Sequence, residues 1–497
     1  MSSKISIKKN FIMNSILTMS NFIFPFITFP YIARILGPAG SGKVQLALSV
    51  VTYFSMFAEL GIPSYGIRAC ARVRDNKKEL SKVVHELLII NLLLCLVVYA
   101  VFFLCVAFIP MMNREKNLYL IVSLTILLNA VGIEWMYRAL EQYTYITLRS
   151  VIFKAVSIAF MFLLIHQQSD YIIYGAISIF AASASNILNF INARKYIFMK
   201  KCHGYNFKRH FKVVVVFFAM ACATTVYTNL DTVMLGIMKT DADVGYYNAA
   251  VKIKVVLLGL VTSLGAVLLP RASYYIEKGM KEEFLNVSEK AIKFVLFLAA
   301  PITIYFILFA KEGIYFLSGN QYKPSIVPMQ IIMPTVLLIG ISNLTGLQVL
   351  VPEGKEKYVL YSEIAGAVTD LVLNIILIPK YSAAGAATGT LIAEMAVLAV
   401  QFFFVSDDIR KIFTKILYWK NILALVISSI FSVWVKILPL SNIINTLEYR
   451  CFIKLVFSFI IFFGIYILIL KYLKDETVEY ILIEIRNKAG IKKNKSI

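Results

Sequence analysis

The sequence predicts an all-α polytopic membrane protein with about fourteen transmembrane helices: two six-helix lobes followed by two further helices. Two observations carry this prediction. Apolar stretches of roughly 20 residues, the length at which a helix crosses the hydrocarbon core, follow one another from Phe11 to about Lys471. The chain is also 59% hydrophobic and only 16% charged, with a mean hydropathy of +0.76, whereas soluble domains carry more charge.

The apolar stretches are separated by short polar connections, which fix the expected order of the spans. An even number of spans places both termini on the same side of the membrane. The first stretch is too long for the core of a signal peptide, so we expect it to be retained as a span. The expected spans are 11–36, 44–67, 84–108, 117–140, 146–166, 171–192, 212–238, 246–270, 287–310, 328–351, 357–379, 383–405, 417–439 and 451–471.

Lysine and arginine gather in alternate connections. The connections that follow the second, sixth, eighth and twelfth spans are strongly basic, whereas Gly37–Lys43, Gln167–Asp170, Lys239–Asp243 and Lys380–Ala383 are short and nearly uncharged. By the positive-inside rule the basic side is cytoplasmic, which also places both termini in the cytoplasm. The net charge of +22 is therefore a signal of topology, and we expect no nucleic-acid partner.

The sequence predicts no enzyme. The six cysteines form no CxxC pair and the four histidines show no ligand spacing, so neither a disulfide framework nor a metal site is expected. The chain contains no GxxxxGK[ST] motif, and we expect no ATP hydrolysis and no cofactor. Energy then comes from an ion gradient, from the membrane potential or from consumption of a product. The sequence leaves open whether a coupling ion, H+ or Na+, is used.

Several short motifs recur in the same order about two hundred residues later, which indicates an internal duplication. Gly42-Lys-Val-Gln45 returns as Gly245-Tyr-Tyr-Asn248, and Leu60-Gly61 before Arg68 returns as Leu264-Gly265 before Arg271. Six spans per unit place both copies in the same orientation, as in transporters built from parallel repeats. The expected division is an N-terminal lobe at 1–205, a C-terminal lobe at 206–408, and two extra helices with a basic tail at 409–497.

An ordered set of motifs resembles the bacterial flippases of polysaccharide and O-antigen repeat units, members of the multidrug/oligosaccharidyl-lipid/polysaccharide exporter superfamily. The resemblance covers the first twelve spans, and the extra pair of helices is expected of this branch. The motifs are FPYIARILGP at 29–38, LGIP at 60–63 with YGIR at 65–68, DTVMLG at 231–236 with VGYYNAA at 244–250, and LNIILIP at 373–379 with GAATGT at 385–390.

This resemblance implies a function and a mechanism. Such flippases move oligosaccharides linked to undecaprenyl pyrophosphate across the cytoplasmic membrane, for the synthesis of capsule, O-antigen (in lipopolysaccharide) or exopolysaccharide. The resemblance implies two lobes around a central cavity and alternating access by rocking, with the lipid tail remaining in the bilayer. The implied partners are the lipid-linked oligosaccharide, membrane lipids and, as an open alternative, a polysaccharide polymerase.

Charged residues within the expected spans are the candidate site residues, because a charge at the bilayer centre costs roughly 2.5–3.5 kcal/mol on insertion scales. Arg34, Lys252 and Lys254 lie on the spans that, by the resemblance, line the cleft, and we expect them to bind the pyrophosphate. Arg68 and Arg271 end repeat-equivalent spans on the cytoplasmic side and are candidates for capturing it first. For each of these residues a plain alternative stays open, namely pairing with another charge or anchoring at the membrane surface.

Acidic residues within the spans are the candidates for ion coupling: Glu59, Asp231 and Asp370. Glu134 also lies within a span, but Arg138 follows it four residues later, which favours a helix-surface ion pair. Asp370 and Asn374 share a helix face at the same spacing, which favours packing against a partner helix over cation binding.

Two other functions compete with the flippase. A multidrug or cation antiporter of the same superfamily favours acidic cavities, whereas the expected cleft carries Arg34, Lys252 and Lys254 against Glu59 and Asp231. A membrane scaffold for a glycan-assembly complex is the second alternative. The duplication and the charges within the spans argue against it, because a scaffold needs neither.

Overall fold

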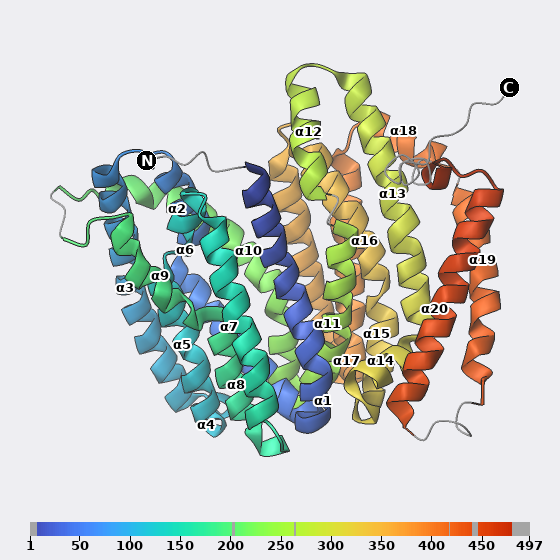
Figure 1. Ribbon diagram of the computed structural model, residues 1–497, viewed down its shortest axis with the longest axis horizontal. Coiled ribbons are helices and arrows are strands. Elements are labelled where there is room, and N and C mark those ends of the chain that lie inside the picture. The colour runs from blue at the N-terminus through green and yellow to red at the C-terminus, as the bar shows by residue number, and fades with distance from the viewer. Residues whose placement is uncertain (1–6, 201–203, 263–264, 417, 440–445, 480–497) are drawn as a thin grey trace. The chain divides into compact units, whose positions relative to one another are not determined.

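The computed structural model describes residues 7–200, 204–262, 265–416, 418–439 and 446–479, and within these ranges every regular element is a helix (Figure 1). The expected all-helical, multi-pass architecture is therefore confirmed. Ten helices in the described part are long and apolar enough to cross a membrane, or eleven if a bent pair at 320–350 counts as one span. The number fourteen is not confirmed and stays a prediction.

Part of the difference in number arises where two helices join across a kink without a loop between them. Helix α1 (Ile7–Glu59) covers the first expected span and most of the second, and α17 (Glu356–Phe404) covers the eleventh and twelfth. Each is interrupted by one residue outside helical geometry, Gly37 at φ 65° and Ser382 at φ 49°. The short, nearly uncharged connections at these places therefore become breaks in a helix and not loops.

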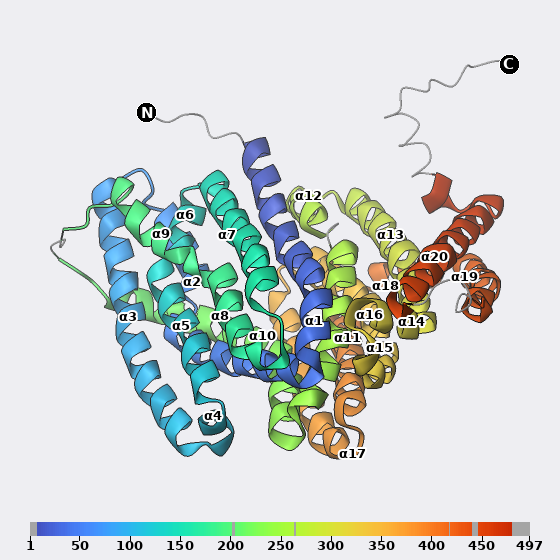
Figure 2. The same cartoon turned by 60° about the horizontal axis from the view of Figure 1, so that its bottom comes forward.

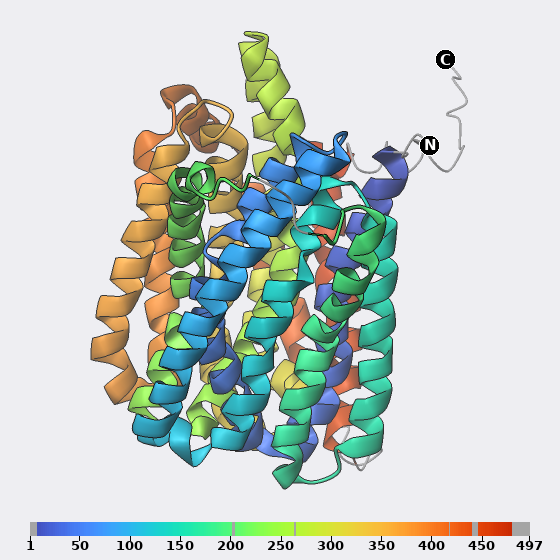
Figure 3. The same ribbon diagram turned by 90° about the vertical axis from the view of Figure 1, so that its left-hand side faces the viewer.

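By its internal contacts the chain divides into two compact units, residues 1–248 and 249–497. In unit 1, α1 packs along α5, α7 and α10, while α2 packs against α6; Figure 3 turns the helices of unit 1 toward the viewer. After α1 the elements of unit 1 are α2 (Ile62–Ala71), α3 (Lys77–Phe108), α4 (Pro110–Arg114), α5 (Lys116–Gly132), α6 (Glu134–Ala139), α7 (Tyr143–Leu164), η1 (Gln168–Asp170), α8 (Tyr171–Ile179), η2 (Phe180–Ala184), α9 (Asn186–Asn192), η3 (Ala193–Lys195) and α10 (Lys208–Met238).

In unit 2, α17 packs against α15 and α16, and α19 and α20 pack on each other beside α13 and α14 (Figure 2). Helix α11 (Asp241–Thr262) crosses from unit 1 into unit 2. The further elements of unit 2 are α12 (Gly265–Glu277), α13 (Lys281–Leu308), α14 (Ala310–Ser318), η4 (Asn320–Ser325), α15 (Ile326–Ile332), α16 (Pro334–Asn343), η5 (Leu344–Leu350), α18 (Asp407–Lys415), α19 (Tyr418–Val433), η6 (Trp434–Ile437) and α20 (Leu447–Tyr472), together with α17.

The boundary between the contact units at 248/249 lies later than the boundary at 205/206 that the duplication predicts. The reason is that α10 makes its contacts with α1 and α2. The contact units reflect how the helices pack, whereas the predicted boundary reflects the similarity between the two halves of the sequence. The three-part division therefore stays a prediction.

Besides the break at Gly37, three irregular segments interrupt the expected spans of unit 1. Between α1 and α2 both Leu60 and Gly61 have left-handed backbones, at φ 45° and 71°. Between α5 and α6, Ile133 is left-handed at φ 38°. The segment η2 is a π-helix. Left-handed leucine and isoleucine are strained, and π-helical turns are frequent at functional sites. The expected spans 44–67 and 117–140 are thus each broken, a feature that hydropathy does not reveal.

Candidate functional site

Unit 1 encloses a polar cavity of about 300 Å³ at the first of these breaks. Its wall comes from the end of α1, the start of α2, α5 and α10. Most of its polar groups are hydroxyls and one is a carboxylate, so the cavity offers many oxygen ligands in an otherwise apolar bundle. The polar residues that line it are Thr52, Ser55, Glu59, Ser64, Thr125, Asn129 and Thr225.

Glu59 is the acidic residue of this cavity, and it is the last residue of α1 because the helix ends at the Leu60-Gly61 break. Its Oε1 accepts hydrogen bonds from Ser55 Oγ and from Asn129 Nδ2, each at 3.0 Å. Within the described residues no basic side chain forms an ion pair with it. Neutral donors alone thus satisfy this carboxylate, an arrangement suited to a group that takes up a proton or a cation.

Asn129 links Glu59 to a larger network. Its Oδ1 accepts hydrogen bonds from Ser183 Oγ at 3.1 Å and from Asn186 Nδ2 at 3.2 Å. Asn186 Oδ1 in turn accepts one from Arg149 Nη1 at 3.2 Å, and the same guanidinium nitrogen reaches the Ser185 carbonyl at 2.7 Å. The chain of hydrogen bonds therefore runs from the cavity to an arginine side chain that is only 4% exposed.

Arg149 is balanced by Glu134, whose Oε2 lies 2.9 Å from Arg149 Nη2. The other oxygen of Glu134 accepts from Arg138 at 2.7 Å, so the ion pair expected from the four-residue spacing is confirmed. Glu134 thus joins a buried arginine to an exposed one. All three irregular segments supply this network: Glu59 precedes the first break, Glu134 follows the second, and Ser183 lies in η2.

A second buried cluster holds the start of α10 against α3. The Glu86 side chain has no exposed surface and accepts hydrogen bonds from the backbone nitrogen of Asn206 at 2.6 Å and from Arg209 Nη2 at 2.6 Å. His210 Nε2 lies 2.7 Å from the same carboxylate, and its Nδ1 lies 2.7 Å from the Tyr65 hydroxyl. This cluster anchors the end of the basic connection expected to be cytoplasmic.

Four of the predicted site residues belong to unit 1. Arg34 lies on α1 just before the Gly37 break, and its Nη1 donates to the Pro30 carbonyl at 2.6 Å. Arg68 is exposed in the last turn of α2. Asp231 is buried on α10 and accepts a hydrogen bond from the Tyr247 hydroxyl. Of the four, only Glu59 lines the polar cavity.

The other four belong to unit 2. Lys252 and Lys254 are partly buried on α11, and Arg271 is exposed on α12. Asp370 is buried on α17 beside Asn374, and a Cβ on Gly389 would lie 3.1 Å from Asp370 Oδ1 and 2.5 Å from Asn374 Oδ1. The two polar side chains therefore pack directly on a glycine backbone, as the shared helix face predicts.

Sequence reasoning missed Arg149, Asn129, Glu86 and His210. Arg149 and Glu86 lie near the starts of expected spans, where a charge normally marks the membrane surface. His210 follows Arg209 in a basic connection and lacks metal-ligand spacing. No group of three or more His, Cys, Asp or Glu side chains suited to a metal ion occurs in the described ranges. The partners of all four missed residues are distant in sequence, so no local pattern marks them.

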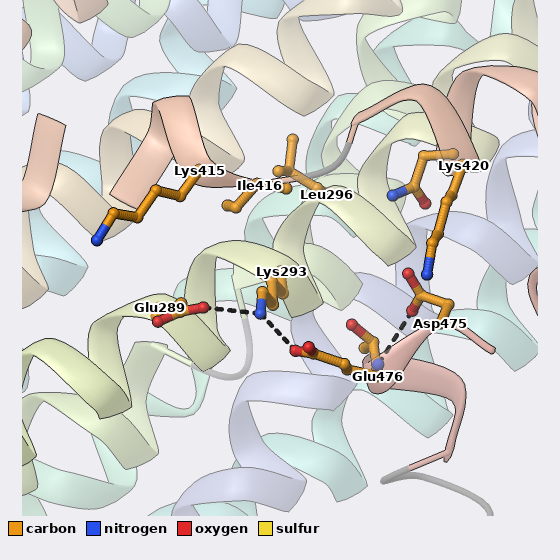
Figure 4. Close-up of a pocket in the computed structure, with 10 residues that line it drawn as sticks. Glu289, Lys293, Leu296, Lys415, Ile416, Lys420, Asp475 and Glu476 are labelled. Carbon is orange, nitrogen blue, oxygen red and sulfur yellow. Dashed lines mark hydrogen bonds and ion pairs between the residues drawn. The ribbon is translucent and has the colours of Figure 1, made fainter. Parts of the chain in front are cut away.

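Unit 2 has a smaller charged pocket of about 190 Å³ among α13, the connection from α18 to α19, and the end of α20 (Figure 4). Lys293 lies between two carboxylates, 2.7 Å from Glu289 and 2.6 Å from Glu476. Lys420 Nζ donates to the Lys474 carbonyl at 3.2 Å. These contacts hold the α19–α20 pair against α13 and are structural in character.

Fold and site together define a multi-pass helical membrane protein with buried charges among its helices, two of whose acidic residues, Glu59 and Glu134, flank helix breaks. The profile of the family described as "Polysaccharide biosynthesis protein" matches residues 7–276, more than half of the chain. A second profile, MatE, matches residues 217–376. The chain therefore belongs to the polysaccharide biosynthesis protein family, within the multidrug/oligosaccharidyl-lipid/polysaccharide exporter superfamily, and the resemblance seen in its motifs is confirmed.

Two curated relatives extend over most of the chain. Proteins described as "Putative O-antigen transporter" from Escherichia coli (strain K12) and Shigella dysenteriae are 23% and 26% identical, over 82% and 79% of this chain and 98% of each relative. Among solved structures, the lipid II flippase MurJ in an inward closed conformation superimposes with a TM-score of 0.71 at 17% identity, over 93% of this chain and 99% of that chain. At that identity the likeness concerns the fold.

Proposed function

We propose that this protein is a flippase that moves oligosaccharides linked to undecaprenyl pyrophosphate across the cytoplasmic membrane by alternating access. The observation that carries the proposal is the match to 98% of the length of two relatives described as O-antigen transporters. The family match and the helical fold support it. The polymer served is a capsule, an O-antigen or an exopolysaccharide, and a polysaccharide polymerase would act on the product.

The diphosphate is the anionic part of the proposed substrate, and five basic residues are its proposed contacts. Arg34, Lys252 and Lys254 would hold it during translocation, while Arg68 and Arg271 would capture it on the cytoplasmic face. The exposure of Arg68 and Arg271 suits capture from solution or from a membrane surface. A charge-assisted hydrogen bond to a phosphate contributes about 1.5–3 kcal/mol, so losing one such contact lowers affinity about ten- to hundredfold.

Ion coupling is assigned to Glu59, with Asp231 and Asp370 as further candidates. The polar cavity supports this role for Glu59, because its carboxylate lies among hydroxyl and amide groups and accepts only neutral hydrogen bonds. Either H+ or Na+ would suit such a site. Uptake of the ion would remove a buried negative charge, which changes the stability of the helix break beside it.

A gene-replacement experiment tests the proposed function. In a bacterium that lacks its own flippase for a surface polysaccharide, this chain should restore the polymer if it accepts that repeat unit. Purified protein in vesicles should also move a fluorescent undecaprenyl-diphosphate oligosaccharide between leaflets, and Arg34→Ala should slow that movement more than Arg34→Lys. Failure in vesicles that contain folded protein and a matching repeat unit contradicts the proposal.

The same vesicles separate the rival functions. A multidrug or cation antiporter would move a cationic dye against an imposed ion gradient and ignore the oligosaccharide. A membrane scaffold would move neither compound, although its loss would still reduce polymer in cells. The proposed flippase moves the lipid-linked oligosaccharide without dye transport.

The proposed topology places both termini and the connection around Lys200 in the cytoplasm. Reporter fusions at Lys200 and at Lys116, both exposed, should therefore report opposite sides of the inner membrane. The same side for both would contradict the topology without affecting the transport result.

A further inference from the structure

Unit 1 contains a second and larger hollow, at the end of the helices where α3 turns into α4. Its volume is about 840 Å³, and its walls come from the second half of α1, the α3–α4 turn and the last turn of α10. The residues that line this outer groove are Val50, Phe54, Ile109, Pro110, Met111, Met112, Arg114, Val233, Gly236, Ile237, Lys239, Thr240 and Asp241.

The outer groove has two chemically different parts. Its long walls are apolar, and two of its side chains face outward: Ile237 is 67% exposed and Ile109 is 40% exposed. Ile237 lies on α10 and Ile109 directly follows α3, and both helices are long and apolar enough to cross a membrane. These exposed side chains would therefore meet lipid and not water. The walls therefore suit a hydrocarbon chain that runs along the helices.

One end of the outer groove is charged. Arg114, Lys239 and Asp241 all lie there, and Arg114 Nη2 is 3.1 Å from Asp241 Oδ2. The ion pair fixes the guanidinium at the mouth, where the side chain keeps 65% of its surface exposed. Arg114 Nε also lies 3.9 Å from Glu115 Oε1, and Glu115 pairs with Lys43 at 2.5 Å. Three cations, Lys43, Arg114 and Lys239, therefore stand against two carboxylates, which leaves one net positive charge at this end. In the proposed topology the ends of α10 and α4 lie on the side where the positive-inside rule disfavours cations, so these residues need another reason to be present.

We propose that the outer groove binds an anionic phospholipid of the outer leaflet, with an acyl chain along the apolar walls and its phosphate at Arg114 and Lys239. The apolar walls of the groove match the acyl chain of such a lipid. The positive charge at the end of the groove matches its phosphate, which lies at the depth of the headgroups. Lysine can extend its chain along apolar surface while the ammonium reaches the phosphate. This assignment rests on the proposed topology for the choice of leaflet, but not on the transport activity.

Crosslinking in vesicles tests the assignment. The photoreactive residue p-benzoylphenylalanine is placed at Ile237, in the outer groove, or at Leu96, which is 70% exposed on α3 and does not line the groove. The protein is reconstituted in equimolar phosphatidylglycerol and phosphatidylcholine, irradiated, and its lipid adducts are identified by mass spectrometry. At Ile237, phosphatidylglycerol adducts should exceed phosphatidylcholine adducts by about fivefold, the ratio expected from one lysine–headgroup contact. At Leu96 the two lipids should react equally.

Charge variants make the test decisive. Lys239→Gln should reduce the preference at Ile237, and Lys239→Gln with Arg114→Gln should abolish it. Lys116→Gln is the matched control, because Lys116 is exposed at the start of α5 next to α4 but does not line the groove. A preference at Ile237 that equals that at Leu96, or that survives the double substitution, overturns the proposal. A preference for phosphatidylcholine overturns it as well.

Discussion

Gly42 and Gly245, which the predicted duplication pairs with each other, lie in direct backbone contact in the structure. A Cβ on Gly42 would lie 1.7 Å from the Asp241 carbonyl oxygen and 2.9 Å from the Gly245 nitrogen. A Cβ on Gly245 would lie 2.0 Å from the Pro38 carbonyl oxygen. Both glycines lie within unit 1, so the first turns of α11 pack on the segment of α1 just after its break.

Alanine at either glycine should separate these backbones, because a carbonyl in a helix cannot rotate away as a side chain can. We expect Gly42→Ala and Gly245→Ala each to cost about 1–3 kcal/mol, as overpacking does, and to lower the midpoint of thermal unfolding. Gly464→Ala is the control, since its Cβ would meet nothing within 4 Å and it lies inside α20. If all three variants had the same midpoint of thermal unfolding, the backbone contact between α1 and α11 would have room for a methyl group.

Removing the charge of Glu59 should stop ion coupling and leave the fold intact. Glutamine can still accept from Ser55 and Asn129, so Glu59→Gln should change the free energy of unfolding by less than about 1 kcal/mol. Transport driven by an ion gradient should fall at least about tenfold, the loss expected from one charge-assisted interaction. Ser64→Ala, in the same cavity, should transport normally. Gradient-driven transport at the wild-type rate in Glu59→Gln excludes this carboxylate from coupling.

Arg149 and Arg138 both pair with Glu134, but replacing them should change the free energy of unfolding by different amounts. Arg149 is 4% exposed and Arg138 is 42% exposed, yet both pair with Glu134. Arg149→Met removes the hydrogen bonds that the guanidinium donates to Glu134, to Asn186 and to the Ser185 carbonyl, and should cost about 1.5–3 kcal/mol. Arg138→Met should cost less than about 1 kcal/mol, as exposed pairs do. Denaturant unfolding in detergent measures both. Similar costs would mean that Arg149 is solvated in the protein.

The cluster around Glu86 should control the start of α10. Glu86→Gln removes the charge that holds Arg209 and should cost about 1.5–3 kcal/mol, the range for hydrogen bonds to charged groups. Amide exchange at Asn206 should accelerate, because its N–H donates to Glu86. Glu79→Gln, in the first turn of the same helix, makes the same charge change and should leave exchange at Asn206 unchanged. Faster exchange in both variants would point to a general effect of charge.

The Lys293–Glu476 pair should give a small pH dependence. The Lys293 ammonium lowers the pKa of Glu476 below its ordinary value of 4.5. A lowered carboxyl pKa stabilises the fold above that ordinary value, and the contribution disappears as the pH falls through the lowered pKa. Because Glu476 is exposed, Glu476→Gln should cost less than about 1 kcal/mol near pH 7 and nothing in strong acid. Glu479→Gln should show no such change. A cost for Glu476→Gln that does not vary with pH contradicts the pair's role.

Hydropathy and charge predicted the helical class and the ion pair of Glu134 with Arg138, because both follow from local spacing. The internal repeat pointed to Gly42 and Gly245 as equivalent, although not to their contact. The breaks at Leu60 and Ile133 were not predicted, since neither residue favours a left-handed backbone. The network from Glu59 to Arg149 was not predicted either, because it joins α1, α5, α7 and α9 through partners as far apart as Glu59 and Asn129.

The left-handed backbone of Ile133 has a consequence for biosynthesis. At the first break Gly61 and Pro63 end the helix locally, whereas isoleucine does not break a helix by itself, so the surrounding side chains must impose the break at Ile133. When residues 117–140 first enter the bilayer, their neighbours are not yet packed, and this span should insert as one straight helix. The break would then form during assembly of the bundle. A lone peptide of residues 116–140 in lipid should therefore be an uninterrupted rod, and the contact of Glu134 with Arg149 would not exist until the helices have come together.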